Sequence, residues 1–171
     1  MPELTRIFDA AAINEHLLAL SNKINKDYEG RTLDIVYVTN GASMLCADLV
    51  RLIKVPLRIH PITYSSYPKM NETGEIRLTL DVTEPLFGKH VLLLDGIIIS
   101  GRTPHYVSNL LMQRKPASLQ VGALGIKPHL LISELKVAYY AFEFNDEIVT
   151  GYGIGSGEEK AHGALYKQTN N

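Results

Sequence analysis

The chain alternates between segments whose apolar residues repeat at helical spacing and segments that suit strands. After Asp9, which fits a helix N-cap, apolar residues recur every three or four positions up to about Gly30. Residues 33–38 form a mostly apolar run that predicts a buried strand, and a polar break then leads into a second helical stretch over 43–54. Strand, loop and helix in this order predict an α/β fold.

The second half of the chain continues this alternation. Residues 57–62 and 76–82 predict an antiparallel strand pair that flanks a long polar loop. Residues 91–94 are apolar on both faces, as in a central parallel strand, and a helix over 103–114 is expected after them. The remaining strands of this central, mostly parallel sheet are expected at 119–126 and 137–142.

Composition narrows the class of protein. The 171 residues carry a formal net charge of −1, which argues against nonspecific nucleic-acid binding. The apolar runs are shorter than the roughly 18 residues that cross a bilayer, and no signal-like start is visible, so we expect one cytoplasmic domain over 1–171 with no membrane contact. Cys46 lies among apolar residues and is expected to be buried. The spacing of the histidines predicts no structural metal site.

The segment 91–103 contains the strongest candidate chemistry. Asp95 follows the central strand, and a turn of small residues then opens a helix, which places free N–H groups and the helix dipole where a phosphate binds. The candidate phosphate ligands are Ser100, Gly101, Arg102 and Thr103. On this segment alone, a plain strand-to-helix turn with a surface arginine is an equal alternative.

Residues 91–103 also resemble the signature of the type I phosphoribosyltransferases, in which an apolar strand, two acids and two apolar residues precede Asp-Thr-Gly-x-Thr. Further segments resemble the hypoxanthine-guanine branch of that family, in the family's order. They are 36–49 (its pyrophosphate loop and helix), 65–76 (its mobile catalytic loop), 88–92, and the purine-binding segments 123–127 and 148–154.

The resemblance implies a fold, a reaction and partners. The fold is the α/β sheet described above with a small hood formed by the terminal segments. The reaction is purine salvage: a 6-oxopurine, hypoxanthine or guanine, takes the phosphoribosyl group from 5-phosphoribosyl-1-pyrophosphate (PRPP), with Mg²⁺ as the helper ion. The partners are these small molecules, the nucleoside monophosphate product, and further copies of the chain in a dimer or tetramer.

The resemblance also assigns roles to individual residues. Asp95 would bind the ribose and contribute weakly to a metal site, Asn40 and Gly41 would bind pyrophosphate, and residues 100–103 would bind the 5′-phosphate. The purine would lie against Lys127, Ile148 and Val149, with Lys127 donating to its exocyclic oxygen. Ser66 and Tyr67 would belong to the mobile loop, and we expect residues 64–75 to be mobile without ligand.

The sequence departs from the family signature where catalysis would be supported. Gly96 replaces the second acid, Ile99 replaces the aspartate that the family uses as general base, and Gly155 replaces a further aspartate. These departures predict a slow enzyme, in which aspartate at positions 96 and 99 would raise turnover. The alternative is a non-catalytic descendant that binds a nucleotide or phosphate and acts through a partner.

Overall fold

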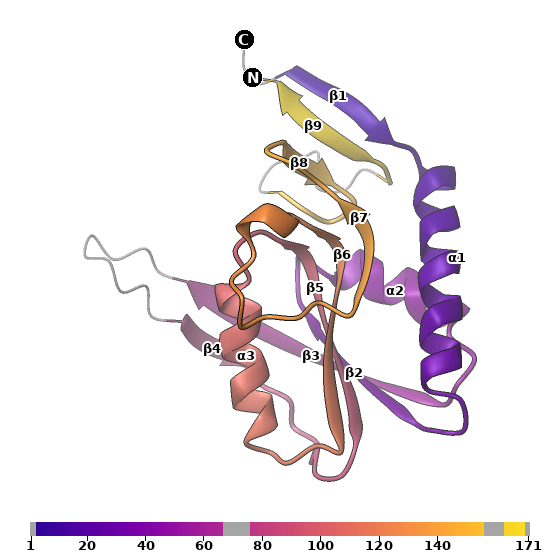
Figure 1. Ribbon diagram of the computed structural model, residues 1–171, viewed down its shortest axis with the longest axis vertical. Coiled ribbons are helices and arrows are strands. Elements are labelled where there is room, and N and C mark those ends of the chain that lie inside the picture. The colour runs from indigo at the N-terminus through magenta and orange to yellow at the C-terminus, as the bar shows by residue number, and fades with distance from the viewer. Residues whose placement is uncertain (1–2, 67–75, 156–162, 170–171) are drawn as a thin grey trace.

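The protein consists of a large sheet covered by helices on both faces and a smaller sheet at one end (Figure 1). A computed structural model describes residues 3–66, 76–155 and 163–169. The elements, in chain order, are β1 (Glu3–Phe8), α1 (Ala10–Asp27), β2 (Leu33–Val38), α2 (Ser43–Leu52), β3 (Leu57–Ser66), β4 (Ile76–Leu80), β5 (His90–Ile98), α3 (Arg102–Met112), β6 (Ser118–Ile126), the 3₁₀ helix η1 (Pro128–Leu130), β7 (Tyr139–Glu143), β8 (Ile148–Gly151) and β9 (Leu165–Thr169).

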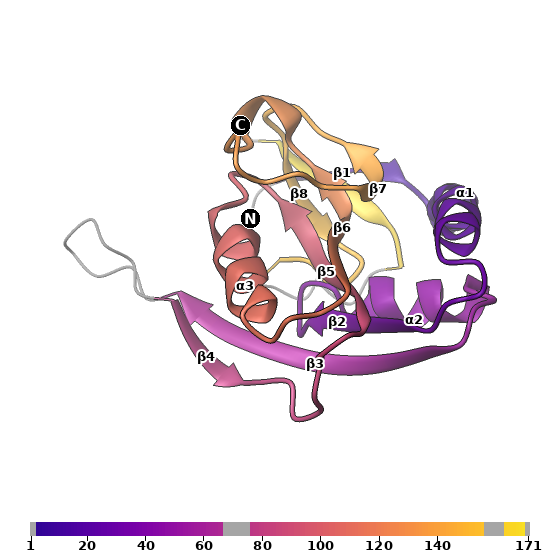
Figure 2. The same cartoon turned by 60° about the horizontal axis from the view of Figure 1, so that its bottom comes forward.

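The large sheet has the strand order β4-β3-β2-β5-β6-β7. All neighbours in it are parallel except β3 and β4, which are antiparallel. Helices α1 and α2 pack on one face with the first core cluster, and α3 packs on the other face with the second cluster (Figure 2). This arrangement confirms the predicted mostly parallel sheet and its antiparallel strand pair.

The small sheet, with the order β1-β9-β8, joins the two ends of the chain and forms the expected hood. Its strands were not predicted individually, because β1 is exposed or half-buried along its whole length and β8 has only four residues, so neither forms a long apolar run. Within the described residues, none of the helices is long and apolar enough to cross a membrane.

Several element boundaries differ from the prediction. The strand expected over 91–94 runs on to Ile98, so Asp95 lies within β5 and not in the loop after it. Helix α3 begins at Arg102, one residue earlier than expected, and α2 ends at Leu52, two residues earlier. Asp9 caps α1 as predicted, since its Oδ1 accepts a hydrogen bond from Ala12 N at 2.9 Å. Cys46 is buried as predicted, and burial raises the pKa of its thiol to about 11.

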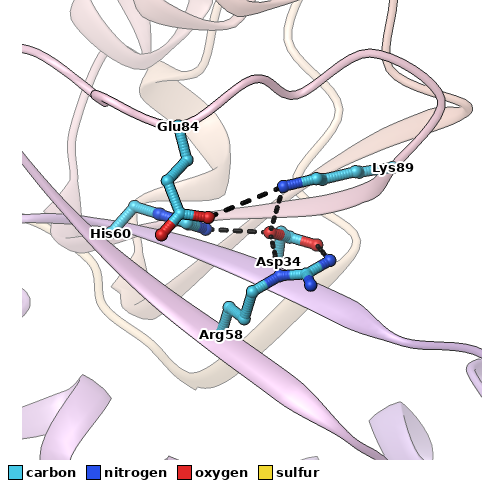
Figure 3. A network of polar contacts seen from close by, with 5 residues as sticks. All are labelled: Asp34, Arg58, His60, Glu84 and Lys89. Atoms are coloured by element: carbon cyan, nitrogen blue, oxygen red, sulfur yellow. Dashed lines mark hydrogen bonds and ion pairs between the residues drawn. The ribbon is translucent and has the colours of Figure 1, made fainter.

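A buried charge network ties together the amino ends of the central strands (Figure 3). Asp34 in β2 is fully buried and accepts hydrogen bonds from Arg58 Nε at 3.0 Å, Arg58 Nη2 at 3.1 Å and His60 Nε2 at 2.8 Å. Lys89 Nζ lies 3.6 Å from Asp34 and 3.7 Å from Glu84. Burial alone would raise the pKa of Asp34, but the hydrogen bonds from Arg58 and His60 outweigh it and hold the pKa below its usual value of 3.8.

Candidate active site

A cavity of about 390 Å³ lies between the carboxyl ends of the large sheet and the hood. Residues from β5, from the β2–α2 loop, from the end of β6 and from the segment around β8 all line it. They are Asn40, Gly41, Asp95, Gly96, Ile97, Ile99, Lys127, Glu147, Ile148, Val149, Gly153, Ile154 and Gly155. Ligand sites in open α/β sheets lie at this end of the strands. We refer to this cavity as the main cavity.

A second cavity of about 220 Å³, the loop cavity, adjoins the main cavity where β5 leads into α3. The two cavities share Asp95, Ile97 and Ile99. The loop cavity is lined in addition by Tyr64, Ile98, Ser100, Gly101, Thr103 and Pro104. The shared residues make the two cavities parts of one continuous candidate site.

Asp95 is the acidic group at the centre of this site. Its Oδ1 accepts a hydrogen bond from Gly96 N at 2.7 Å, and its Oδ2 accepts one from the Tyr64 hydroxyl at 3.1 Å. Within the described ranges, no cationic side chain forms an ion pair with it. Burial raises the pKa of Asp95, and the two hydrogen bonds oppose that shift only in part. A carboxylate held this way has spare acceptor capacity for hydroxyl groups of a ligand.

The β2–α2 loop packs directly on β5. Asn40 has a left-handed conformation (φ 68°), which asparagine tolerates, and its N–H donates to Ser43 Oγ at 3.1 Å. A Cβ atom at Gly96 would lie 2.7 Å from Gly41 O, closer than the backbone permits without a shift. Because Gly96 has no side chain, the β2–α2 loop can pack against β5. The expectation that an aspartate at position 96 would raise turnover is therefore corrected, because its Cβ would displace this loop.

The loop between β5 and α3 lines the loop cavity as the phosphate interpretation requires. Gly101, the N-cap of α3, has a left-handed conformation (φ 77°) and no side chain to cap the helix. Of the first-turn N–H groups, Arg102 N donates to Ser100 Oγ at a long 3.5 Å. Ser100 and Thr103 face this cavity, whereas Arg102 is exposed and lines neither cavity. Ile99 is 51% exposed and contributes to both cavities.

The other side of the main cavity combines one cation with an apolar surface. Lys127 follows β6 and is only 7% exposed, so it is not a solvated surface lysine. No hydrogen bond or ion pair joins its ammonium group to another side chain in the part of the chain that the structure describes. Ile148 is 54% exposed and, with Val149, presents apolar surface to the cavity. A buried ammonium group beside an apolar surface suits a flat ligand with an oxygen acceptor.

The structure describes only some of the remaining predicted site residues. Ser66 is the last residue of β3, where its backbone pairs with Ile76, and Tyr67 lies outside the described residues, as does most of the expected mobile loop. Gly155 lines the main cavity.

A Mg²⁺ ion needs oxygen ligands, of which proteins often supply one or two carboxylates while substrate phosphates and waters supply the rest. Among the described residues, no three His, Cys, Asp or Glu side chains gather into a metal-binding group. Asp95 would be the protein carboxylate nearest the substrate phosphates, since it is shared by both cavities. That donor set fits an ion shared with substrate phosphates.

Two side chains at the site were not predicted from the sequence. Glu147 lines the main cavity beside Ile148, and Tyr64 reaches Asp95 from β3. Burial, with the negative charge of Asp95, raises the pKa of the Tyr64 phenol well above its usual value, so this group acts as a hydrogen-bond donor.

Comparison with known proteins agrees with this geometry. Residues 3–156 match the model of the phosphoribosyl transferase domain. The chain is 36% identical to a hypoxanthine phosphoribosyltransferase of Haemophilus influenzae, over 83% of this chain and 82% of that protein. It is 33% identical to the Salmonella typhimurium hypoxanthine phosphoribosyltransferase, over 89% and 87%.

A solved structure has the same fold over nearly the whole chain. The hypoxanthine-guanine phosphoribosyltransferase of Bacillus anthracis superposes with a TM-score of 0.91 at 29% identity, covering 98% of this chain and all (100%) of that one. The family model spans far more than half of the sequence. From the sequence match and the shared fold together, the chain belongs to the phosphoribosyltransferase family.

Proposed function

We propose that the protein is a 6-oxopurine phosphoribosyltransferase, which transfers the phosphoribosyl group of PRPP to hypoxanthine or guanine. The relatives described above carry this activity in their names. The observation that carries the proposal is that Lys127, a buried residue whose ammonium group has no side-chain partner among the described residues, lines the same cavity as Asp95. A purine 6-oxo group would satisfy that ammonium group.

The residues around the two cavities have separate roles in this reaction. Asp95 accepts hydrogen bonds from the ribose hydroxyls, and Ser100, Gly101 and Thr103 bind the 5′-phosphate at the start of α3, with the Arg102 side chain outside the cavity. Asn40 and Gly41 bind pyrophosphate in the β2–α2 loop, Ile148 and Val149 pack against the purine ring, and Lys127 donates to its oxygen.

The chemistry needs orientation more than proton transfer. The bond from ribose C1 to the pyrophosphate oxygen breaks, a bond from C1 to the purine nitrogen forms, and that nitrogen loses its proton. Charge develops on the ribosyl carbon as pyrophosphate leaves, so positioning supplies much of the rate. Asp95, together with the substrate phosphates, would hold Mg²⁺, which when bound would supply charge neutralisation of the leaving group. Ile99 accepts no proton, so the proton passes to water and turnover is slow.

A second candidate function is nucleotide binding without turnover. Gly96 and Ile99 favour it, because neither position carries the acid that would act in catalysis, whereas the loop of residues 100–103 keeps the pattern of a phosphate site. In this case the protein acts through a partner.

A product assay separates the two. Hypoxanthine, guanine, xanthine and adenine are each incubated with PRPP and Mg²⁺, and nucleotide formation is followed by chromatography. Formation of inosine or guanosine monophosphate supports the enzyme, whereas tight nucleotide binding with no product from any base supports the binding protein.

We also propose that the protein works in the cytoplasm as a homodimer or homotetramer, as the family resemblance implies. Sedimentation velocity at micromolar concentration tests the assembly, and a monomer throughout would contradict it.

A further inference from the structure

Tyr64 occupies an unusual position between two strands that are not neighbours. Strand β2 separates β3 from β5 in the sheet, and its pairing with β3 ends at Val38, opposite Ile62. Beyond that point β3 pairs with β4 alone, and the register shifts between Thr63, opposite Leu80, and Tyr64, opposite Leu78, which leaves Thr79 as an extra residue on β4. Bulges of this kind increase the local twist of a strand pair, and they are frequent beside active sites.

The end of β2 gives Tyr64 access to β5. Two strand spacings, roughly 10 Å, separate β3 from β5. The phenol extends across this gap, and its hydroxyl donates to Asp95 Oδ2 at 3.1 Å. With Gly96 N on Oδ1 at 2.7 Å, each carboxylate oxygen has one donor, and the plane of the carboxylate is fixed.

The same phenol also forms part of the wall of the loop cavity, beside Ile99 and Ser100. A shorter side chain at position 64 would leave Oδ2 without a donor from the described residues and would leave the carboxylate free to rotate. Lys127 and Glu147 line the main cavity near Asp95, but neither is hydrogen-bonded to it.

We propose that Tyr64 is a positioning residue for ribose recognition, which holds the Asp95 carboxylate so that it accepts hydrogen bonds from the sugar hydroxyls. Asp95 has no neighbouring acid at position 96 to share this task, so its orientation decides how well the hydroxyls are bound. The inference rests on the proposed function, and it predicts discrimination between nucleotides that have and lack these hydroxyls.

The test compares inosine 5′-monophosphate with its 2′,3′-dideoxy analogue, using calorimetry on the full chain. In Tyr64→Phe, which removes one oxygen and keeps the ring, the affinity for inosine monophosphate falls about tenfold, as expected for loss of a hydrogen bond that supports a charged acceptor. The affinity for the dideoxy analogue stays within about twofold, because that ligand makes no use of the oriented carboxylate.

Tyr139→Phe is the matched control. It deletes another tyrosine-to-aspartate hydrogen bond, from Tyr139 to Asp27 at 2.8 Å, at the opposite end of the sheet. We expect this control to lower stability alone and to leave unchanged the ratio between the affinities for inosine monophosphate and its dideoxy analogue. Replacing Tyr64 by 4-aminophenylalanine retains the ring and a donor, and restores the preference for inosine monophosphate even if Tyr64→Phe proves too unstable to study.

The outcomes distinguish this inference from the function on which it rests. If the unmodified protein binds neither nucleotide, the proposed function fails and the role of Tyr64 fails with it. If it binds both and Tyr64→Phe weakens them equally, or weakens neither, the role of Tyr64 is wrong while the function stands. Loss of the preference in the 4-aminophenylalanine variant also overturns the role.

Discussion

Replacing Ile99 by aspartate tests whether the missing base limits turnover. Ile99 is 51% exposed and lines both cavities, so an aspartate there faces solvent and remains ionised at neutral pH. Because the position is exposed, the new carboxylate is not buried without a partner. A general base contributes about 100- to 10,000-fold. We expect the low end, about 100-fold in kcat, because water reaches the new group and Asp95 lies in the same cavity.

The stability cost of this change is small. Complete burial of an isoleucine contributes about 1.5–3 kcal/mol, and about half of that applies at a half-exposed position, or roughly 1 kcal/mol. For a chain of this length, such a loss lowers Tm by about 2–4 °C. The Ile99→Asp protein therefore remains folded at assay temperature.

The assay is steady-state formation of inosine monophosphate from hypoxanthine and PRPP. Ile99→Asn is the matched control, because it has the same size as aspartate and no proton-accepting carboxylate. The gain should appear in kcat with little change in KM, since a base acts as the transition state forms. The reasoning is refuted if both variants gain equally, or if the unmodified protein already turns over at about 1–1,000 per second.

Three further predictions concern other parts of the molecule. Gly96→Ala should lower stability by about 1–3 kcal/mol and weaken PRPP binding, because its Cβ would displace Gly41, whereas Gly163→Ala, with nothing within 4 Å, should leave Tm and KM unchanged. Lys127→Met should lower kcat/KM for hypoxanthine about 10- to 100-fold and leave any slow reaction of adenine unaltered; an equal fall for both bases would contradict its role in reading the 6-oxo group. Asp34→Asn should lower Tm by about 6–12 °C at pH 7, from roughly 3 kcal/mol of lost charge pairing. Because the pKa of Asp34 in the folded protein is below 3.8, that stabilisation is present above about pH 4 and disappears as the pH falls through this pKa. The difference in Tm between the unmodified protein and Asp34→Asn should therefore close at low pH. Asp146→Asn, which removes an exposed ion pair with His129, is the control and should have little effect.

Local patterns in the sequence predicted the large sheet well and its boundaries less well. Apolar runs such as 33–38 and 91–94 predict buried strands because burial on both faces requires apolar side chains throughout. Asp95 did not fit this pattern, since a single acid after an apolar run resembles the end of a strand. Its half-buried position within β5 is supported by hydrogen bonds from Gly96 N and from Tyr64, a residue of another strand.

The parts of the site that the sequence did not predict depend on contacts between distant residues. Gly96 was interpreted as the loss of an acid, and its steric role became visible only from its distance to Gly41. Tyr64 carries no local signal of its role, because its reach depends on where β2 ends. The phosphate loop, in contrast, is a continuous segment, so its residues could be identified together.

The network around Asp34 also fixes the alignment of the strands that carry the site. Asp34 lies on β2 opposite Arg58, while His60, two residues further along β3, lies on the same face, and Lys89 comes just before β5. A slip of either neighbouring strand by one residue would turn these partners to the other face of the sheet and leave the carboxylate buried without them. A single ionised group at the amino ends thus penalises misaligned sheets during folding. Because this register also sets which residues meet at the carboxyl ends of the strands, it fixes the spacing between Tyr64 on β3 and Asp95 on β5.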